Sequence, residues 1–293
     1  MKKCATSTVV GAASAALLAL VVGASNAHAQ GADTPNPKST ETPTDLGDAL
    51  PSEHLTGDWG GWRTRLSNAG VDLTPSYTSE TAGVVSGGRR QGVDYAHNIG
   101  LEADVDWGKL AGVQGFSTHI NVVERAGRDA SSDYVGEHLT EVQEIYGSGG
   151  DVGVHLGYLY AEQKLLGGKL DIQAGRLDVG QDFDTSPLYC EFMNLTVCPQ
   201  SRSLSTQSGF TIFPTSTWGG RVRAQPLGSL YVQLGAFQVR AAGGGRSGFD
   251  FSTTGTTGAL IPLEVGIEPQ FGPNRLVGHY KLGAVYNLSL IHI

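Results

Sequence analysis

The sequence contains few cysteines and few charged side chains, and each shortage narrows the range of folds. Of 293 residues, 3 are cysteine, and 16% are charged. So few cysteines cannot hold a fold together through disulfides. After residue 29 no apolar run reaches the roughly 20 residues that a transmembrane helix needs. The mature chain is therefore either soluble or a β-barrel, and its slightly negative mean hydropathy fits both, because only alternate residues of a barrel strand face lipid.

Catalytic and cofactor motifs are missing as well. No Gly-x-Ser-x-Gly, His-Glu-x-x-His or Walker-type sequence occurs. His97, His119, His155 and His279 fall on separate predicted strands without metal-ligand spacing. A hydrolase site assembled from Ser, His and Asn on different strands is the remaining enzymatic alternative. We predict no enzyme, no cofactor and no bound metal.

The N-terminus carries the features of a secretory signal peptide. Lys2 and Lys3 precede an apolar run over residues 9–23, and Ala27-His28-Ala29 forms a small-residue cleavage site. We expect residues 1–29 to be removed after Ala29. Removal takes away two lysines and no acidic residue, so the net charge changes from −8 to −10. An acidic exported chain is not expected to bind nucleic acid.

Two short segments follow the signal. Residues 30–54 are rich in Thr and Pro and predict a flexible arm. In residues 55–70 the apolar side chains of Trp62, Leu66 and Ala69 lie four and then three positions apart, which suits one face of a short helix that ends at Gly70. We expect this helix to pack on the end of the following domain rather than to act as a gate.

From Val71 onward the chain alternates between apolar and polar residues. In residues 99–107 the odd positions are apolar, whereas the even positions include Glu102, Asp104 and Asp106. About nine runs of this kind occur up to residue 290, and most are long enough for the roughly 9–11 residues of a tilted transmembrane strand. This pattern predicts an all-β fold of antiparallel strands.

Aromatic positions and turn lengths favour a transmembrane barrel over a β-sandwich. Short turns such as residues 166–169 alternate with long polar connections such as residues 125–150, as in outer-membrane barrels. Aromatic residues lie near the ends of the runs, where an interfacial girdle would place them. The residues concerned are Tyr95, Trp107, Tyr158, Tyr160, Trp218, Tyr231, Tyr280 and Tyr286. Residues 71–293 are thus predicted to be a barrel, and because an odd strand number cannot close it, we expect further strands from sequence beyond residue 293.

Three stretches resemble the OprB-type carbohydrate-selective porins of Gram-negative outer membranes. They are LTGDWGGWRTRL at Leu55–Leu66, GGKLDIQAGRLDVGQDFDTSPLYCEFMNLTVC at Gly167–Cys198, and RSLSTQSGFTIFPTSTWGGRVRAQP at Arg202–Pro226. The resemblance implies a sixteen-stranded outer-membrane barrel in contact with lipid, narrowed by inward-folded loops, through which monosaccharides such as glucose diffuse. It leaves open whether the barrels form homo-oligomers.

The segment from Arg176 to Cys198 departs from the alternation, and we predict that residues 182–216 form the constriction loop. Cys190 and Cys198 are close in sequence and exported, which favours a disulfide between them. After Gly175 the apolar parity changes, which predicts a β-bulge that re-aims Arg176.

Sugar recognition requires hydrogen-bond donors, acceptors and aromatic faces. The residues that supply them here, and that we predict to line the pore, are Arg176, Asp178, Asp182, Phe183, Asp184, Tyr189, Glu191, Asn194 and Arg202, together with Arg221 and Arg223 on one face of a later strand.

Each of these predictions has an alternative. A single charged residue on a wetted barrel wall is often only solvated or part of a structural ion pair. Opposed arginines and carboxylates could serve a general or anion-selective porin equally well. A calcium site at Asp178, Asp182 and Asp184 matches no known loop spacing. A secreted β-sandwich module that binds carbohydrate is the alternative from another class, and passive diffusion of small neutral sugars is the function we predict.

Overall fold

The protein is one curved antiparallel sheet in which each long strand pairs with its neighbour in sequence. The computed structural model describes residues 23–24, 56–136, 138–149, 153–198, 200–205, 209–240 and 247–289. The long strands are β2 (Val71–Val84), β3 (Gly92–Asp106), β4 (Phe116–Gly127), β5 (Gly153–Leu165), β6 (Leu170–Leu177), β7 (Thr217–Leu227), β8 (Leu230–Arg240), β9 (Thr256–Ile267) and β11 (Leu276–Asn287). Two-residue strands β1 (Gly23–Ala24) and β10 (Gln270–Phe271) both pair with β11.

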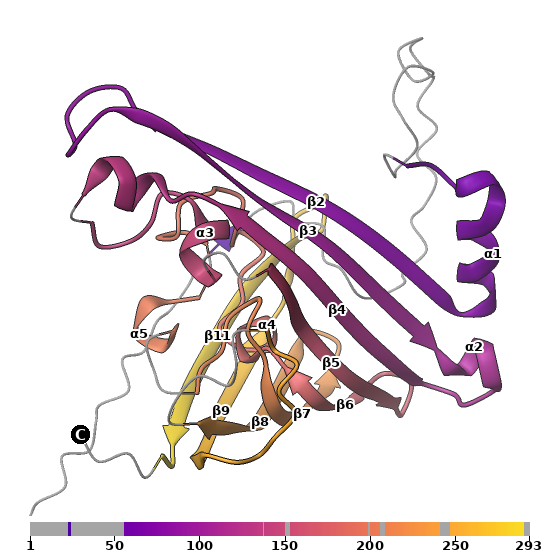
Figure 1. Cartoon of the computed structure of the whole chain (residues 1–293). Helices are drawn as coiled ribbons and strands as arrows, with labels where there is room; N and C mark the ends of the chain where they lie inside the picture. The colour runs from indigo at the N-terminus through magenta and orange to yellow at the C-terminus, as the bar shows by residue number, and fades with distance from the viewer. Residues whose placement is uncertain are drawn as a thin grey trace, which may run out of the picture.

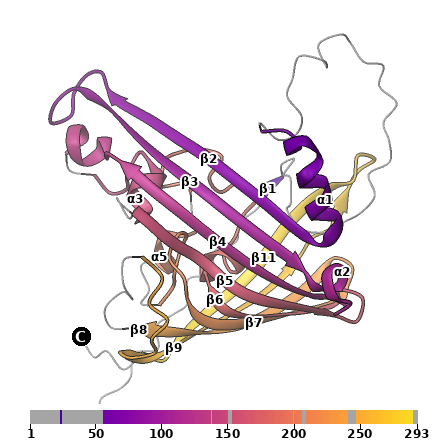
Figure 2. The same cartoon turned by 45° about the vertical axis from the view of Figure 1, so that its right-hand side comes forward.

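The strands form an open trough rather than two facing sheets (Figures 1 and 2). Strand β2 lies at one edge, and within the described residues it does not pair with the β11 side of the sheet. The prediction of an all-β antiparallel fold is confirmed, whereas the β-sandwich alternative is wrong for the described strands. The predicted signal peptide and arm lie outside the described residues, apart from the backbone of Gly23–Ala24.

Alternation explains why these sequences form this sheet. In paired strands β9 and β11, the outward side chains are apolar and partly exposed, including Leu263, Val265 and Leu282. The inward side chains of the same strands include Glu264 and Lys281. Apolar residues on the convex face and polar residues on the concave face are the arrangement of a barrel wall with lipid outside and water inside.

The aromatic residues divide between the two faces, which corrects part of the girdle prediction. Tyr286 is 65% exposed on the convex face, but Tyr158 is 4% exposed and faces inward with Tyr160. The cause is a β-bulge at Gly157, which the pairing of β4 with β5 skips, so that Tyr158 lies opposite Asn121. Tyr231 also faces inward, and its hydroxyl donates a hydrogen bond to Glu264.

The bulge expected after Gly175 is absent. Strand β6 pairs with β5 and β7 without a register shift, so odd-numbered residues continue to face inward up to Leu177. Leu177 is apolar because it packs in a buried cluster under the segment that follows β6. The members of that cluster are Leu177, Val179, Phe183, Phe210, Phe237, Val239 and Leu260.

Helices lie at the two ends of the sheet. At the short-turn end are η2 (Trp59–Gly61), α1 (Trp62–Ala69) and α2 (Trp107–Ala111), and α1 stops at Gly70, which has a left-handed φ of 94°. Near the long connections are η3 (Ser131–Val135), α3 (Glu144–Gly149), α4 (Val179–Asp182) and α5 (Arg202–Ser205). None of the helices in the described part of the chain is long and apolar enough to cross a membrane.

Candidate functional site

The connection between β6 and β7 leaves the wall and folds over the concave face. Asp178 caps α4 by accepting a hydrogen bond from the Gly180 amide at 3.0 Å, and the same amide donates to the Thr211 carbonyl at 3.0 Å. Phe183 then packs edge-to-face on inward-facing Phe237. An apolar anchor therefore holds this connection against the inner wall, with α4 on the concave side (Figure 1).

Ion pairs join the connection to β6 and β7. The Arg221 guanidinium lies 2.9 Å from Asp171 and 3.1 Å from Asp182, and its side chain is almost fully buried. Burial raises the pKa of Asp182 to about 6, although the Arg221 charge opposes that shift. Arg223 stacks on the Tyr231 ring at 3.9 Å. Both arginines therefore face inward, as alternation predicted, and the charge of Arg221 is matched by two carboxylates.

Strands β9 and β11 hold the next part of the connection. The Asp184 amide donates to Glu264 at 2.9 Å, and the Asp184 carboxylate accepts hydrogen bonds from the amide and hydroxyl of Ser201 at 2.7 Å. Lys281 donates to the carbonyl oxygen of Thr185 at 2.6 Å. These contacts fix residues 184–185, which follow α4, to the inner side of β9 and β11.

A second connection, between β4 and β5, also folds inward. The buried Arg125 donates to Asn98 at 3.0 Å and to the Ile145 carbonyl at 2.9 Å, and it lies 3.7 Å from Glu144. The Ile145 amide in turn donates to Glu80 of β2 at 3.1 Å. Helix α3 is therefore held against the inner surface of β2, β3 and β4.

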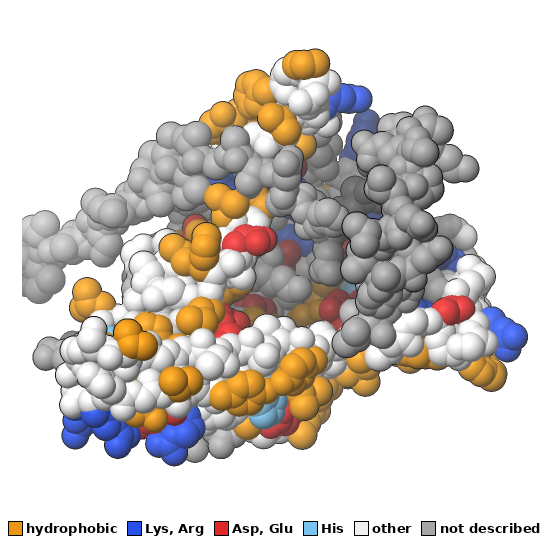
Figure 3. All heavy atoms as spheres, turned by 90° about the horizontal axis from the view of Figure 1, so that it is seen from above, with side chains coloured by type: hydrophobic (Ala, Val, Ile, Leu, Met, Phe, Trp, Pro, Cys, Tyr) orange, Lys and Arg blue, Asp and Glu red, His pale blue; other side chains and the backbone are white. Residues whose placement is uncertain are grey.

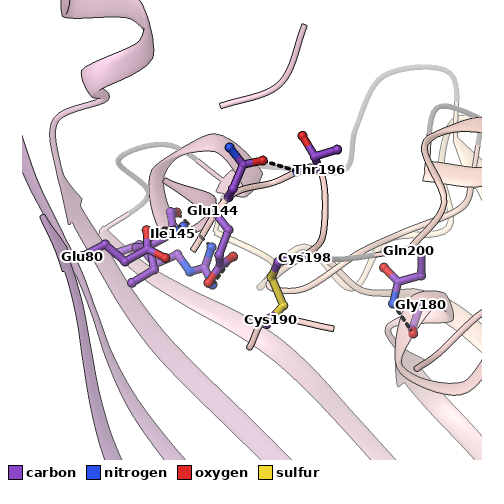
Figure 4. The surroundings of a disulfide bond; sticks show 10 residues. Glu80, Glu144, Ile145, Gly180, Cys190, Thr196, Cys198 and Gln200 are labelled. Carbon is purple, nitrogen blue, oxygen red and sulfur yellow. Dashed lines mark hydrogen bonds and ion pairs between the residues drawn. A yellow bond between two sulfur atoms is a disulfide. The ribbon is translucent and has the colours of Figure 1, made fainter. Parts of the chain in front are cut away.

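The two connections meet at the disulfide loop. Cys190 and Cys198 form the predicted disulfide, and Glu144 and Ile145 lie between it and the wall (Figure 4). The Glu144 amide donates to the Met193 carbonyl at 2.7 Å, and the Leu195 amide donates to the Glu141 carbonyl at 3.0 Å. These bonds couple residues 190–198 to the β4–β5 connection.

A cavity of about 400 Å³ lies between the wall and the two inward-folded connections, β4–β5 and β6–β7. Its wall side is formed by Thr78, Asn98, Glu102, Asn121, Arg125 and Tyr158, and its connection side by Glu144, Ile145, Asp178, Gln181, Tyr189, Cys190, Gln200 and Phe213. Burial raises the pKa of Asp178 well above its usual range and the pKa of Tyr189 to about 12. Acidic side chains are visible within the hollow of the molecule (Figure 3).

The structure brings together only part of the predicted set. Asp178 and Tyr189 line the cavity, Asp182 pairs with Arg221, and Phe183 belongs to the apolar anchor. Asp184 binds Ser201, as described above. Glu191, Asn194, Arg202 and Arg176 complete the predicted set.

Two of these four residues belong to the disulfide loop. Glu191 is exposed, and Asn194 accepts a hydrogen bond from the Thr196 amide at 2.8 Å. Arg202 opens α5, and its side chain lies outside the described part of the structure. Neither Glu191 nor Asn194 is among the described residues that line the cavity.

Arg176 lies on the face opposite to Gln173 and Leu177. It is 3% exposed and donates to the carbonyl oxygens of Ser216 at 2.7 Å and Asp250 at 3.0 Å. Its guanidinium therefore links the start of β7 to the β8–β9 connection, and both of these contacts are with backbone oxygens.

Several cavity residues were not among the sequence candidates. Asn98, Glu102, Asn121 and Arg125 occupy inward positions of β3 and β4, which alternation does indicate. Alternation predicts that these residues face inward, but it does not predict which inward residues lie under a connection and so line the cavity.

The three aspartates considered for calcium have separate partners. Asp178 binds the Gly180 amide, Asp182 binds Arg221 and Asp184 binds Ser201. In the part of the chain that the structure describes, no three His, Cys, Asp or Glu side chains are arranged to hold a metal ion.

Known proteins are similar to this chain in sequence and in architecture. The profile of "Carbohydrate-selective porin, OprB family" matches residues 90–290. Porin B of Pseudomonas aeruginosa is 33% identical over 281 residues, which are 94% of this chain and 58% of that protein. The protein named Putative porin QuiX of Acinetobacter baylyi is 29% identical over 246 residues, which are 80% of this chain and 55% of that protein.

Solved structures agree with the sequence comparison. The high pH structure of Pseudomonas putida OprB superimposes with a TM-score of 0.75 at 32% identity, covering 82% of this chain and 57% of that one. The low pH structure of the same protein gives a TM-score of 0.53 at 26% identity, covering 81% and 62%. The chain spans a little over half the length of the curated relatives it matches.

Proposed function

Because the chain belongs to the OprB family of carbohydrate-selective porins, we propose that it lets small neutral sugars of the glucose type diffuse passively across an outer membrane into the periplasm. The observation that carries this proposal is the polar cavity between the inner wall and the inward-folded connections. The proposal includes an N-terminal signal that directs export, contact between the convex apolar face and membrane lipid, and no catalytic step.

The cavity contains hydrogen-bonding groups that can replace the water molecules around a sugar. Amide and carboxylate oxygens of Asn98, Asn121 and Glu102 accept hydrogen bonds from hydroxyl groups, and the Tyr158 hydroxyl can donate as well as accept. Tyr189 adds an aromatic surface. Each contact is weak and several occur together, which suits a channel, because a solute must bind well enough to enter and weakly enough to leave.

A general or anion-selective pore is the second candidate, because Arg221 and Arg223 both face inward. Against it, the guanidinium of Arg221 is already paired with Asp171 and Asp182. An anion in transit would have to compete with two fixed carboxylates at that point.

Liposome swelling distinguishes these candidates. Vesicles that contain the purified protein are diluted into glucose, an amino acid of similar size, or a small organic anion. We expect glucose to enter severalfold faster than the other two solutes. Equal rates for all three would contradict sugar selectivity and support a general pore, whereas the absence of swelling in every solute would contradict the porin itself.

A further inference from the structure

The cavity contains more hydrogen-bond acceptors and more negative charge than a neutral sugar requires. Three carboxyl groups line it, those of Glu102, Glu144 and Asp178, whereas Arg125 is the one basic side chain among its lining residues. The Arg125 guanidinium is already bound to Asn98, to the Ile145 carbonyl and to Glu144. The charge balance of the lining is therefore negative.

An unpartnered acceptor in the wall points to a ligand that donates. Asn121 is 8% exposed, and its Oδ1 has no hydrogen-bond partner among the described residues. The bulge at Gly157 makes room for it, since a Cβ at Gly157 would lie 2.6 Å from this oxygen. Oε1 of Gln200, on the opposite side of the cavity, also lacks a partner, although its Nε2 donates to the Gly180 carbonyl. Buried acceptors of this kind are uncommon and favour a bound donor.

Asp178 adds a carboxyl to the same cavity lining as these two acceptors. It is 3% exposed and accepts a hydrogen bond from the Gly180 amide, and no salt bridge to it is found among the described residues. Burial raises its pKa well above the usual range, as expected for a carboxyl without a cation nearby. A cation in the cavity would favour the ionised form.

We infer that this cavity binds amino sugars, that is, saccharides whose ring carries a protonated primary amine. An ammonium group has three donors and one positive charge, which match the Asp178 carboxylate and the unpartnered Asn121 Oδ1, while the ring hydroxyls match the remaining amides. The inference rests on the proposed function, because the sugar must enter this pore to reach the cavity. The inference predicts an order of affinity for the cavity in which amino sugars bind most tightly, neutral sugars less tightly and acidic sugars least tightly.

Block of ion current in planar bilayers measures binding inside the channel and tests this ranking. The probes are D-glucosamine, N-acetyl-D-glucosamine, D-glucose and D-glucuronate, at a pH where the free amine is protonated. We expect glucosamine to block at about tenfold lower concentration than glucose, which corresponds to about 1.4 kcal/mol. N-acetylglucosamine, which is neutral, should behave like glucose.

Two variants separate the cavity from the general field of the lumen. Asp178→Asn should bring the glucosamine-to-glucose ratio close to one. The control Asp72→Asn removes an exposed carboxyl on the inner face of β2 outside the cavity, and it should keep the wild-type ratio.

The results that would overturn the amino-sugar inference differ from those that would overturn the proposed sugar-porin function. If wild-type protein passes glucose selectively but binds glucosamine and glucose equally, the inference is overturned and the sugar porin stands. If both variants lose the preference equally, the preference comes from the lumen charge as a whole, which also overturns the inference. Glucose that neither enters vesicles selectively nor blocks the current would overturn the proposed function itself.

Discussion

At the scale of single residues, the carboxyls of Asp171 and Asp182 are paired with a cation, whereas the carboxyl of Asp178 is bound by backbone amides. Arg221 is buried between Asp171 and Asp182, and removing one member of such a group would leave an uncompensated charge. Asp178 is also buried, and it accepts hydrogen bonds from the Gly180 and Phe213 amides, whereas no cation is paired with it among the described residues. A buried carboxyl without a cation destabilises the folded state when it is ionised, and the two amide hydrogen bonds offset only part of that cost for Asp178.

The pH dependence of stability tests this interpretation of Asp178. Its pKa in the folded protein is raised, so its contribution to stability is fully present below the pKa of the unfolded chain, about 4, and is lost as the pH rises through the folded value. Asp178→Asn should therefore unfold at a higher temperature than the wild type at pH 8, and the difference should disappear near pH 4. Heat-modified mobility on gels measures this transition. A variant that is less stable than the wild type at pH 8 would contradict the interpretation.

At the scale of elements, the sequence predicted strands better than it predicted where connections go. The structure has nine long strands where the sequence predicted about nine alternating runs, because period-two patterning is a local property. The sequence pattern wrongly predicted a bulge after Gly175. Leu177 is apolar because it packs against Phe183 and Phe210 of the folded connection, and the alternation pattern contains no information on that packing. For the same reason it placed Tyr158 on the lipid side and did not identify Asn121 as part of the site.

The bulge in β5 can be tested by filling its space. Gly157→Val places a side chain where its Cβ would lie 2.6 Å from Asn121 Oδ1 and 3.0 Å from the Phe213 ring. We expect a loss of about 1–3 kcal/mol in the free energy of unfolding, typical of overpacking, together with weaker sugar binding. The control Gly228→Ala has open space around its Cβ and should change neither. Wild-type stability and binding in Gly157→Val would show that the close contact does not exist.

The disulfide loop can be tested separately from the wall. Replacing Cys190 and Cys198 with Ser leaves all strand pairings in place, so we expect the barrel to fold with its usual heat-modified mobility. The bonds from Met193 and Leu195 to the β4–β5 connection should loosen, and the ratio of glucose to amino-acid flux should fall. An unchanged ratio would remove this loop from the selectivity mechanism.

At the scale of the whole molecule, the two inward connections and the curved wall act as one unit. The wall alone would enclose a wide, wet trough, and the connections from β4 and β6 cover part of it and leave the cavity beside them. They are held by Arg125, Arg221 and Lys281, inward residues of β4, β7 and β11, which contact Ile145, Asp182 and Thr185 of the connections. A narrow passage with fixed polar walls is what a channel needs to select a solute by its hydrogen bonds.

Single-channel conductance in the presence of glucose tests whether sugar passes through this narrowed region. The ion current through the wild-type protein in a planar bilayer is recorded while glucose is added in increasing concentration. A sugar that occupies the cavity must obstruct ions, so we expect a fall in conductance that saturates, and a higher half-saturating concentration in Gly157→Val. A conductance that falls only as much as the increased viscosity of the solution requires, with no saturation, would show that glucose does not occupy the cavity during passage.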